Sequence, residues 1–177
     1  MRLADFSLTN MEPLVVEWEE LAAGLLRAAK GMSSLALRDH AVQILQAVAA
    51  DMSTYQSRQQ QLDKSHGLAE PAFDASETAA QTHAVLRARS GFDIKQLAAE
   101  YRALRTSVLR LWSDKFRDAA RTEFYDVIRF NEAIDQALAE SISFFSDQVE
   151  QSRNLLLGVL GHDLRNPLQT IHVTATY

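Results

Sequence analysis

Apolar residues recur at intervals of three and four along almost the whole chain, whereas no segment alternates convincingly between apolar and polar residues. The first spacing gathers apolar side chains on one face of an α-helix, and strict alternation would be expected of a half-buried strand. Proline and glycine, which interrupt helices, number only three and six in 177 residues. The pattern therefore predicts an all-α protein.

Two helices are expected before the clearest loop of the chain. The first opens at Thr9, where Glu12 three residues later forms a capping box, and it ends at Gly31. The second begins near Ser34 and keeps its apolar positions in register before a glutamine-rich stretch. Residues 63–74 contain a glycine and a proline, so this segment is predicted to be a loop.

Two further helices complete a predicted bundle over residues 1–121. A short one covers roughly Ser76–Ser90 and ends at Gly91. The next begins with Asp93 as its N-cap, and Gln96 three residues later completes a capping box. The apolar stripe of this fourth helix consists of Ile94, Leu97, Ala98, Tyr101, Leu104, Val108, Leu111, Trp112 and Phe116. Helices with such stripes bury them against one another, which predicts a helical bundle.

A fifth, much longer helix is predicted from Thr122, since no proline occurs before Pro167. It completes the bundle, and its apolar positions continue past the point where a small bundle should end. These positions are Ile134, Leu138, Ile142, Phe145 and Val149. Because an apolar seam that leaves a core would face water, residues 122–154 are expected to form a coiled coil with a second copy of the chain.

Composition and charge exclude several classes of function. The formal charge of -5 argues against a nucleic-acid partner, since such surfaces gather excess Lys and Arg. The absence of cysteine removes disulfides, thiolate metal sites and cysteine nucleophiles. No apolar stretch approaches the roughly 20 residues of a membrane span, and the N-terminus lacks the apolar centre of a signal peptide. We therefore expect no membrane insertion and a cytoplasmic location.

One contiguous motif carries chemistry: Gly161-His162-Asp163-Leu164-Arg165-Asn166-Pro167-Leu168. It resembles the H-box of dimeric sensor histidine kinases of the HisKA type. The resemblance implies that His162 is the phosphoacceptor, that Asp163 is its base or hydrogen-bond partner, and that Asn166 positions water for dephosphorylation. It also implies that Pro167 bends the helix, and that residues 155–177 begin a dimerisation and phosphotransfer domain.

The residue types suit phosphoryl transfer by themselves. A neutral imidazole is a nucleophile near physiological pH, and an adjacent carboxylate can fix its tautomer and stabilise its developing positive charge. Leu160 and Leu164 share one helical face, while His162 lies about 200° from each. This geometry predicts that His162 points away from the apolar seam.

A second resemblance covers about residues 10–148. The segments Gly91-Phe92-Asp93-Ile94, Glu100-Tyr101-Arg102-Ala103-Leu104-Arg105 and Arg129-Phe130-Asn131-Glu132-Ala133-Ile134-Asp135 are similar to the N-terminal domain of bacterial stressosome co-antagonist proteins. That domain is also found ahead of histidine kinases. The similarity implies a helical regulatory input domain related to globins that carry no haem, and it identifies no ligand.

Other candidate residues favour structural roles. His83 could ligate haem or a metal, but it shares a face with apolar residues and is better explained as a core histidine, as is His40. His66 is expected on a loop surface, and His172 lacks the acidic neighbour of His162. Aromatic and basic residues from Tyr101 to Trp112 could form an anion pocket, yet a core stripe with a solvated basic flank explains them better. We expect no metal or cofactor in this chain.

The sequence lacks a glycine-rich phosphate loop. The kinase resemblance therefore implies that ATP and Mg²⁺ bind to a kinase domain outside this chain, which ends at Tyr177 before the family's nucleotide-binding motifs. We expect this chain to be part of a longer homodimeric kinase and to be inactive alone. Its expected partners are a response regulator receiver domain and an unknown small-molecule or protein signal.

Two alternatives remain open. One is a non-catalytic scaffold, as in stressosomes, in which the histidine motif would be incidental. The other is a stand-alone histidine phosphotransfer module, which also displays a histidine on a helix. The proline five residues after His162 and the neighbouring Asp163 favour the kinase.

Overall fold

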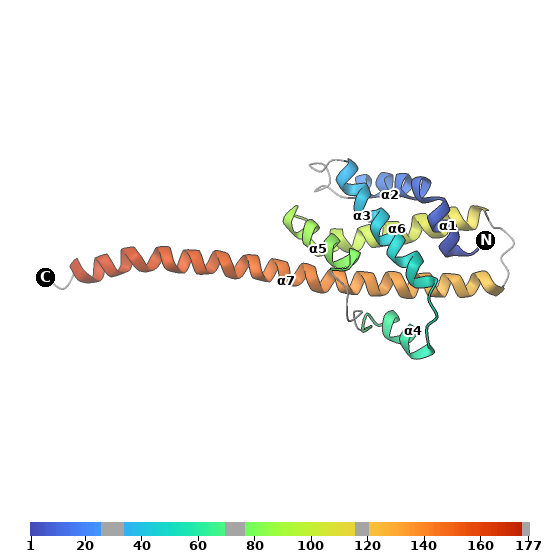
Figure 1. Cartoon of the computed structure of the whole chain (residues 1–177). Coiled ribbons are helices and arrows are strands. Elements are labelled where there is room, and N and C mark those ends of the chain that lie inside the picture. Colours follow the sequence, from blue (N-terminus) through green and yellow to red (C-terminus); the bar gives the residue numbers. More distant parts are fainter. Residues whose placement is uncertain (26–33, 70–76, 116–120, 175–177) are drawn as a thin grey trace. The chain divides into compact units, whose positions relative to one another are not determined.

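A computed structural model describes residues 1–25, 34–69, 77–115 and 121–174 of the chain. Within these ranges the protein is all-helical, with seven helices and no strand, as the spacing of apolar residues predicts (Figure 1). The helices are α1 Leu3–Thr9, α2 Met11–Leu25, α3 Ser34–Met52, α4 Arg58–Ser65, α5 Ala79–Arg89, α6 Ile94–Lys115 and α7 Arg121–Thr174. The predicted helix end at Gly31 lies outside the described residues.

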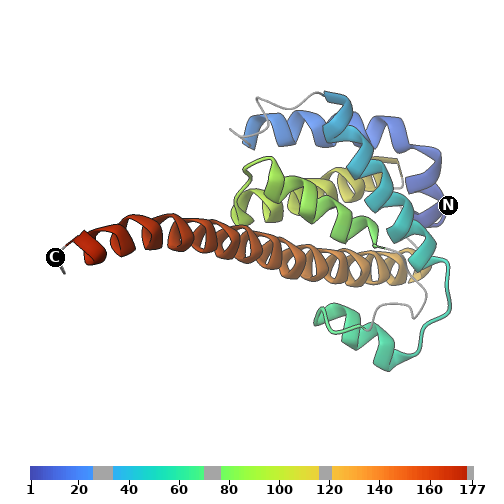
Figure 2. The same ribbon diagram turned by 60° about the vertical axis from the view of Figure 1, so that its left-hand side comes forward.

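The chain divides into two compact units, Met1–Phe145 and Ser146–Tyr177. The first unit holds α1 to α6 and the beginning of α7. Within it, α6 lies between α2 and the first part of α7 (Figure 2). The predicted helical bundle is therefore present, and it includes the first 25 residues of α7.

The fourth predicted helix forms as its sequence indicates. Asp93 accepts a hydrogen bond from the backbone N–H of Gln96 at 2.8 Å, and the Gln96 side chain accepts one from the Asp93 N–H at 2.8 Å. Gly91 precedes this cap with a φ of 77°, a left-handed conformation that glycine adopts without strain. The buried residues of the predicted stripe are Leu97, Tyr101, Leu104, Val108 and Trp112. Each half of the capping box thus satisfies a backbone donor at the start of α6.

Two short helices were not predicted. Thr9 ends α1 instead of opening the first helix, and α1 buries Leu3 and Phe6 in the core. The second predicted helix ends at Met52, and α4 follows where the glutamine-rich stretch and the start of the predicted loop were expected. Ser57 opens α4 with a complete capping box. These differences shorten the loop that follows α3.

Gly67 fixes the segment after α4 against α7. Its φ is 68°, and a Cβ at this position would overlap the side chain of Ala139. The Ala69 N–H also donates to the Gln136 side chain at 3.2 Å. Residues 67–69 therefore lie directly on α7, and Gly67 adopts a left-handed, closely packed conformation that favours glycine.

The apolar seam of α7 leaves the bundle later than its sequence suggests. Ile134 and Phe145 are buried in the core of the first unit, and Leu138 and Ile142 pack against that core. The expectation that these four positions lie past the bundle is therefore wrong. The exposed seam begins at Val149.

Candidate functional site

The three motif residues, His162, Asp163 and Asn166, all fall within α7. The helix continues through Pro167 to Thr174, so His162 and Asn166 are separated by about one helical turn. The side chains of residues 161–177 are outside the described part of the structure. The predicted orientation of His162 away from the seam stays a prediction.

The stretch of α7 before the motif exposes an apolar surface, which we call the α7 apolar surface. Its residues and exposed fractions are Val149 48%, Leu155 72%, Leu156 61%, Leu157 53%, Val159 58% and Leu160 48%. Side chains of this size rarely gather on the surface of a soluble monomer without a partner.

A buried ionic cluster joins α5 to α6. Arg87 directs its guanidinium at Glu100: Nε lies 2.9 Å from both carboxylate oxygens, and Nη2 lies 2.8 Å from Oε1. His83 Nε2 lies 3.0 Å from Oε2 of the same carboxylate. All three side chains are at most 2% exposed. One carboxylate is therefore shared by two basic groups in the interior.

The environment sets the charge of each member. Burial lowers the pKa of His83, more than its contact with Glu100 raises it. Burial alone would raise the pKa of Glu100, but the hydrogen bonds from His83 and Arg87, together with the positive charge of Arg87, outweigh burial and hold that pKa below its ordinary value. The cluster is thus an ionised Arg87–Glu100 pair with a neutral His83, whose Nε2 proton suits the neighbouring carboxylate.

A hydrogen-bonded chain connects the same region to α7. The Tyr101 hydroxyl lies 2.6 Å from the Ser141 hydroxyl, which donates to the Ala80 carbonyl at 2.7 Å. Burial raises the pKa of Tyr101, so the phenol stays protonated. The His83 ring meets the Tyr101 ring edge to face at 5.7 Å. Helices α5, α6 and α7 are thereby held together by polar contacts inside the core.

The histidine candidates take the structural roles that the sequence favours. His83 is a core residue paired with Glu100, and His40 is half-buried with its ring 5.9 Å from that of His83. His66 is exposed at the end of α4. In the described ranges, no group of three or more His, Cys, Asp or Glu side chains could hold a metal ion.

The basic residues of α6 flank its apolar stripe. Arg102 and Arg110 are exposed, and Arg110 pairs with Glu17 of α2 at 2.6 Å. Arg105 pairs with Asp135 of α7. Tyr101 and Trp112 are buried in the core. These contacts fit a core stripe with a basic flank instead of an anion pocket.

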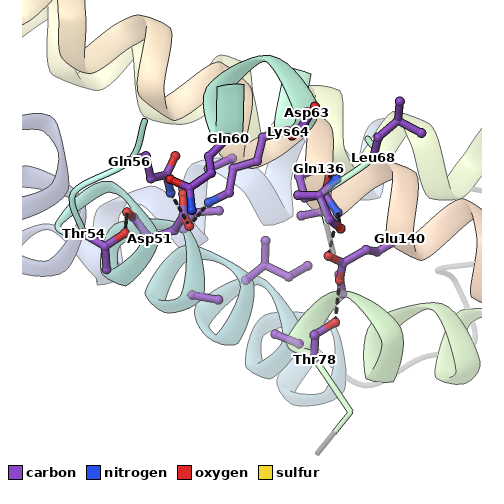
Figure 3. Close-up of a pocket in the computed structure, with 18 of the residues that line it drawn as sticks. Asp51, Thr54, Gln56, Gln60, Asp63, Lys64, Leu68, Thr78, Gln136 and Glu140 are labelled. Carbon is purple, nitrogen blue, oxygen red and sulfur yellow. Dashed lines mark hydrogen bonds and ion pairs between the residues drawn. The ribbon is translucent and has the colours of Figure 1, made fainter. Parts of the chain in front are cut away.

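A cavity of about 800 Å³ opens in the first unit between α3, the α4 region, the start of α5 and α7. Figure 3 shows Asp51, Gln56 and Lys64 gathered at one side of it and Gln136 and Glu140 at the other. Its volume is in the range of small-molecule sites. The cavity could not be predicted from the sequence, because its walls come from segments up to 96 residues apart, from Ile44 to Glu140.

Sequence reasoning also missed the ionic cluster. No ionic role is predicted for Arg87 or Glu100 from the sequence, although His83 and Arg87 are four residues apart and so share one helical face. A histidine and an arginine within an otherwise apolar face were the available signal. Their common partner, Glu100, lies on another helix and could not be chosen from spacing.

Comparisons of this chain with family models, with curated proteins and with solved structures found no match. Within the described ranges, every helix is too short or too polar to cross a membrane. The kinase resemblance accordingly depends on the motif residues themselves.

Proposed function

We propose that this chain is the input and phosphoacceptor region of a homodimeric sensor histidine kinase. One observation carries the proposal: α7 contains both core residues of the bundle and the entire Gly161–Leu168 motif. Phe130, Ile134 and Phe145 are buried in the first unit, and His162 follows on the same uninterrupted helix. A change in the packing of the bundle thus acts on the helix that carries the nucleophile.

The reaction uses ATP and Mg²⁺ bound on a kinase domain outside this chain. A ring nitrogen of His162 attacks the γ-phosphorus of ATP, the bond to the β–γ bridging oxygen breaks, and ADP leaves. Asp163 hydrogen-bonds the other ring nitrogen and stabilises the positive charge that develops on the imidazole. The phosphoryl group then passes to an aspartate of a response regulator receiver domain. Asn166 orients the water that later hydrolyses the phosphorylated receiver.

The α7 apolar surface supports a homodimer. It lies on the stretch of α7 that directly precedes His162, and Leu156 and Leu160 are four residues apart, as in the seam of a coiled coil. Pairing of two α7 helices would remove this surface from water.

The test supplies the ATP-binding domain of a HisKA-type kinase in trans, with radiolabelled ATP and Mg²⁺. The chain should acquire an acid-labile, base-stable label that His162→Gln abolishes without loss of helicity. His172→Gln is the matched control and should label normally. Labelling that persists in His162→Gln would refute the proposal, and no labelling with any such domain would favour a non-catalytic scaffold.

Two variants separate the steps. Asp163→Asn should slow transfer to His162, because the negative partner of the imidazole is lost, while ATP binding to the kinase domain is unchanged. Asn166→Ala should leave labelling intact and slow dephosphorylation of the receiver. If the unchanged chain, Asp163→Asn and Asn166→Ala all show the same rates of transfer to His162 and of receiver dephosphorylation, the assigned roles are wrong.

A further inference from the structure

The cavity beside α7 combines an apolar floor with polar ends. Six alanines line it together with Ile44 and Val48: Ala47, Ala69, Ala79, Ala80, Ala133 and Ala137. Such small side chains leave the helices in place and the space between them open. The polar side chains at the two ends differ in how their charges are balanced.

The carboxylate of Asp51 is neutralised within the protein. Lys64 Nζ forms an ion pair with it, and Gln56 Nε2 donates to the same oxygen at 3.0 Å. Arg129 approaches the other oxygen at 3.8 Å and also donates to the Asp51 carbonyl at 3.0 Å. An incoming cation would have to compete with Lys64 and Arg129 for this carboxylate.

The carboxylate of Glu140, at the other end, receives only neutral donors. Gln136 Nε2 donates to Oε1 at 2.9 Å, and the Thr78 hydroxyl donates to Oε2 at 2.8 Å (Figure 3). No cation is paired with Glu140 in the described part of the chain, and each of its oxygens keeps a second lone pair. Thr78 and Gln136 hold the carboxylate in position, because Thr78 caps α5 and Gln136 is anchored to the Ala69 backbone.

We infer that this cavity binds a small organic cation whose ammonium group pairs with Glu140 and whose apolar body covers the alanine floor. A primary ammonium is a compact donor that fits the remaining lone pairs of a carboxylate. An anion is disfavoured, because Lys64 is already paired and both Asp51 and Asp63 also line the cavity. A volume of about 800 Å³ accommodates a body considerably larger than a short alkyl chain.

The cavity would then be the input site of the kinase, an extension that rests on the proposed function. Four of its lining residues, Ala133, Gln136, Ala137 and Glu140, belong to α7. A ligand that binds one packing of α7 better than another shifts the population toward that packing.

The probe is hexylamine, compared with hexan-1-ol and hexanoate of the same chain length. Binding to the whole chain is followed by calorimetric titration and by the shift in the thermal unfolding midpoint. Hexylamine should bind and raise the midpoint, hexan-1-ol should bind more weakly, and hexanoate should have no effect. Glu140→Gln should weaken hexylamine binding at least about tenfold, since the ion pair is lost while the shape is kept.

Two further variants keep this test decisive. Glu150→Gln removes the same charge from an exposed position outside the cavity and should bind hexylamine as the unchanged chain does. Ala137→Phe fills the floor without changing charge and should abolish binding; circular dichroism confirms that each variant is folded. Equal binding of hexanoate and hexylamine, equal binding by the Glu140→Gln and Glu150→Gln variants, or no amine binding would overturn the inference.

The phosphorylation assay separates the two proposals. His162→Gln should bind hexylamine normally, so a chain that binds the amine but is never phosphorylated would refute the kinase and leave the site intact. With labelling established, hexylamine should change the labelling rate in the unchanged chain and not in Glu140→Gln. An unchanged rate in both would refute the input role alone.

Discussion

Replacing Arg87 with methionine should destabilise the protein severely, because it leaves the buried carboxylate of Glu100 with only the neutral His83 beside it. Arg87 is 0% exposed and makes three contacts of 2.8 to 2.9 Å with Glu100, which is 2% exposed. Methionine is unbranched and a good helix former, so packing and helix propensity change little. Removal of one partner from a buried pair costs about 3–5 kcal/mol in free energy of unfolding.

Two smaller contributions act in the same direction. The guanidinium lies 4.9 Å from the centre of the Phe92 ring, a cation–π contact that methionine cannot make. Arg87 also lies in the last turn of α5, where a positive charge stabilises the helix dipole by about 0.3–1 kcal/mol. They place the expected loss toward the upper part of the range.

The matched control is Arg105→Met on α6. Arg105 pairs with Asp135, but the two side chains are 32% and 39% exposed, so this pair should contribute about 0–1 kcal/mol. The assay is equilibrium unfolding in urea, which does not screen charges, followed by far-ultraviolet circular dichroism at one protein concentration. A loss for Arg87→Met within about 0.5 kcal/mol of the control would refute the reasoning.

The remaining predictions concern pH, backbone strain and assembly. The folded state holds the pKa of His83 below that of the unfolded chain, so the free energy of unfolding should fall as pH drops below about 6.5. In urea titrations at several pH values, His83→Gln should flatten this dependence, and the control His66→Gln should not. Gly67→Ala should lower the free energy of unfolding by at least about 2 kcal/mol, since both the φ of Gly67 and its contact with α7 oppose a Cβ. Gly91→Ala has open space around it and should lower the free energy of unfolding by about 1 kcal/mol, so Gly67→Ala should have the lower thermal unfolding midpoint of the two. Leu156→Gln should shift the chain from dimer toward monomer in sedimentation, and a monomeric unchanged chain would contradict the coiled-coil interpretation.

Elements with strong local signals could be predicted from the sequence. The start of α6 at Asp93 and Gln96 and the end of α5 at Gly91 depend on neighbouring residues only, and both are confirmed. Helix α4 has no buried residue, so it lacks the apolar stripe that identifies helices. Its capping box, Ser57 with Gln60, was the signal that could have revealed it.

Features that join distant segments could not be predicted. Glu100 and Arg87 are 13 residues apart on different helices, and the Tyr101–Ser141 contact spans 40 residues. Spacing within one helix carries no information about which neighbour will face it. The boundary of the exposed seam at Val149 was misplaced for the same reason, since burial of Phe145 depends on the other helices of the bundle.

The central claim is tested most directly by locating the phosphoryl group on the chain. After labelling by a kinase ATP-binding domain in trans, mass spectrometry under neutral conditions should find phosphate on His162 and on none of the other four histidines. Phosphate on His172, or on any histidine other than His162, would contradict the account.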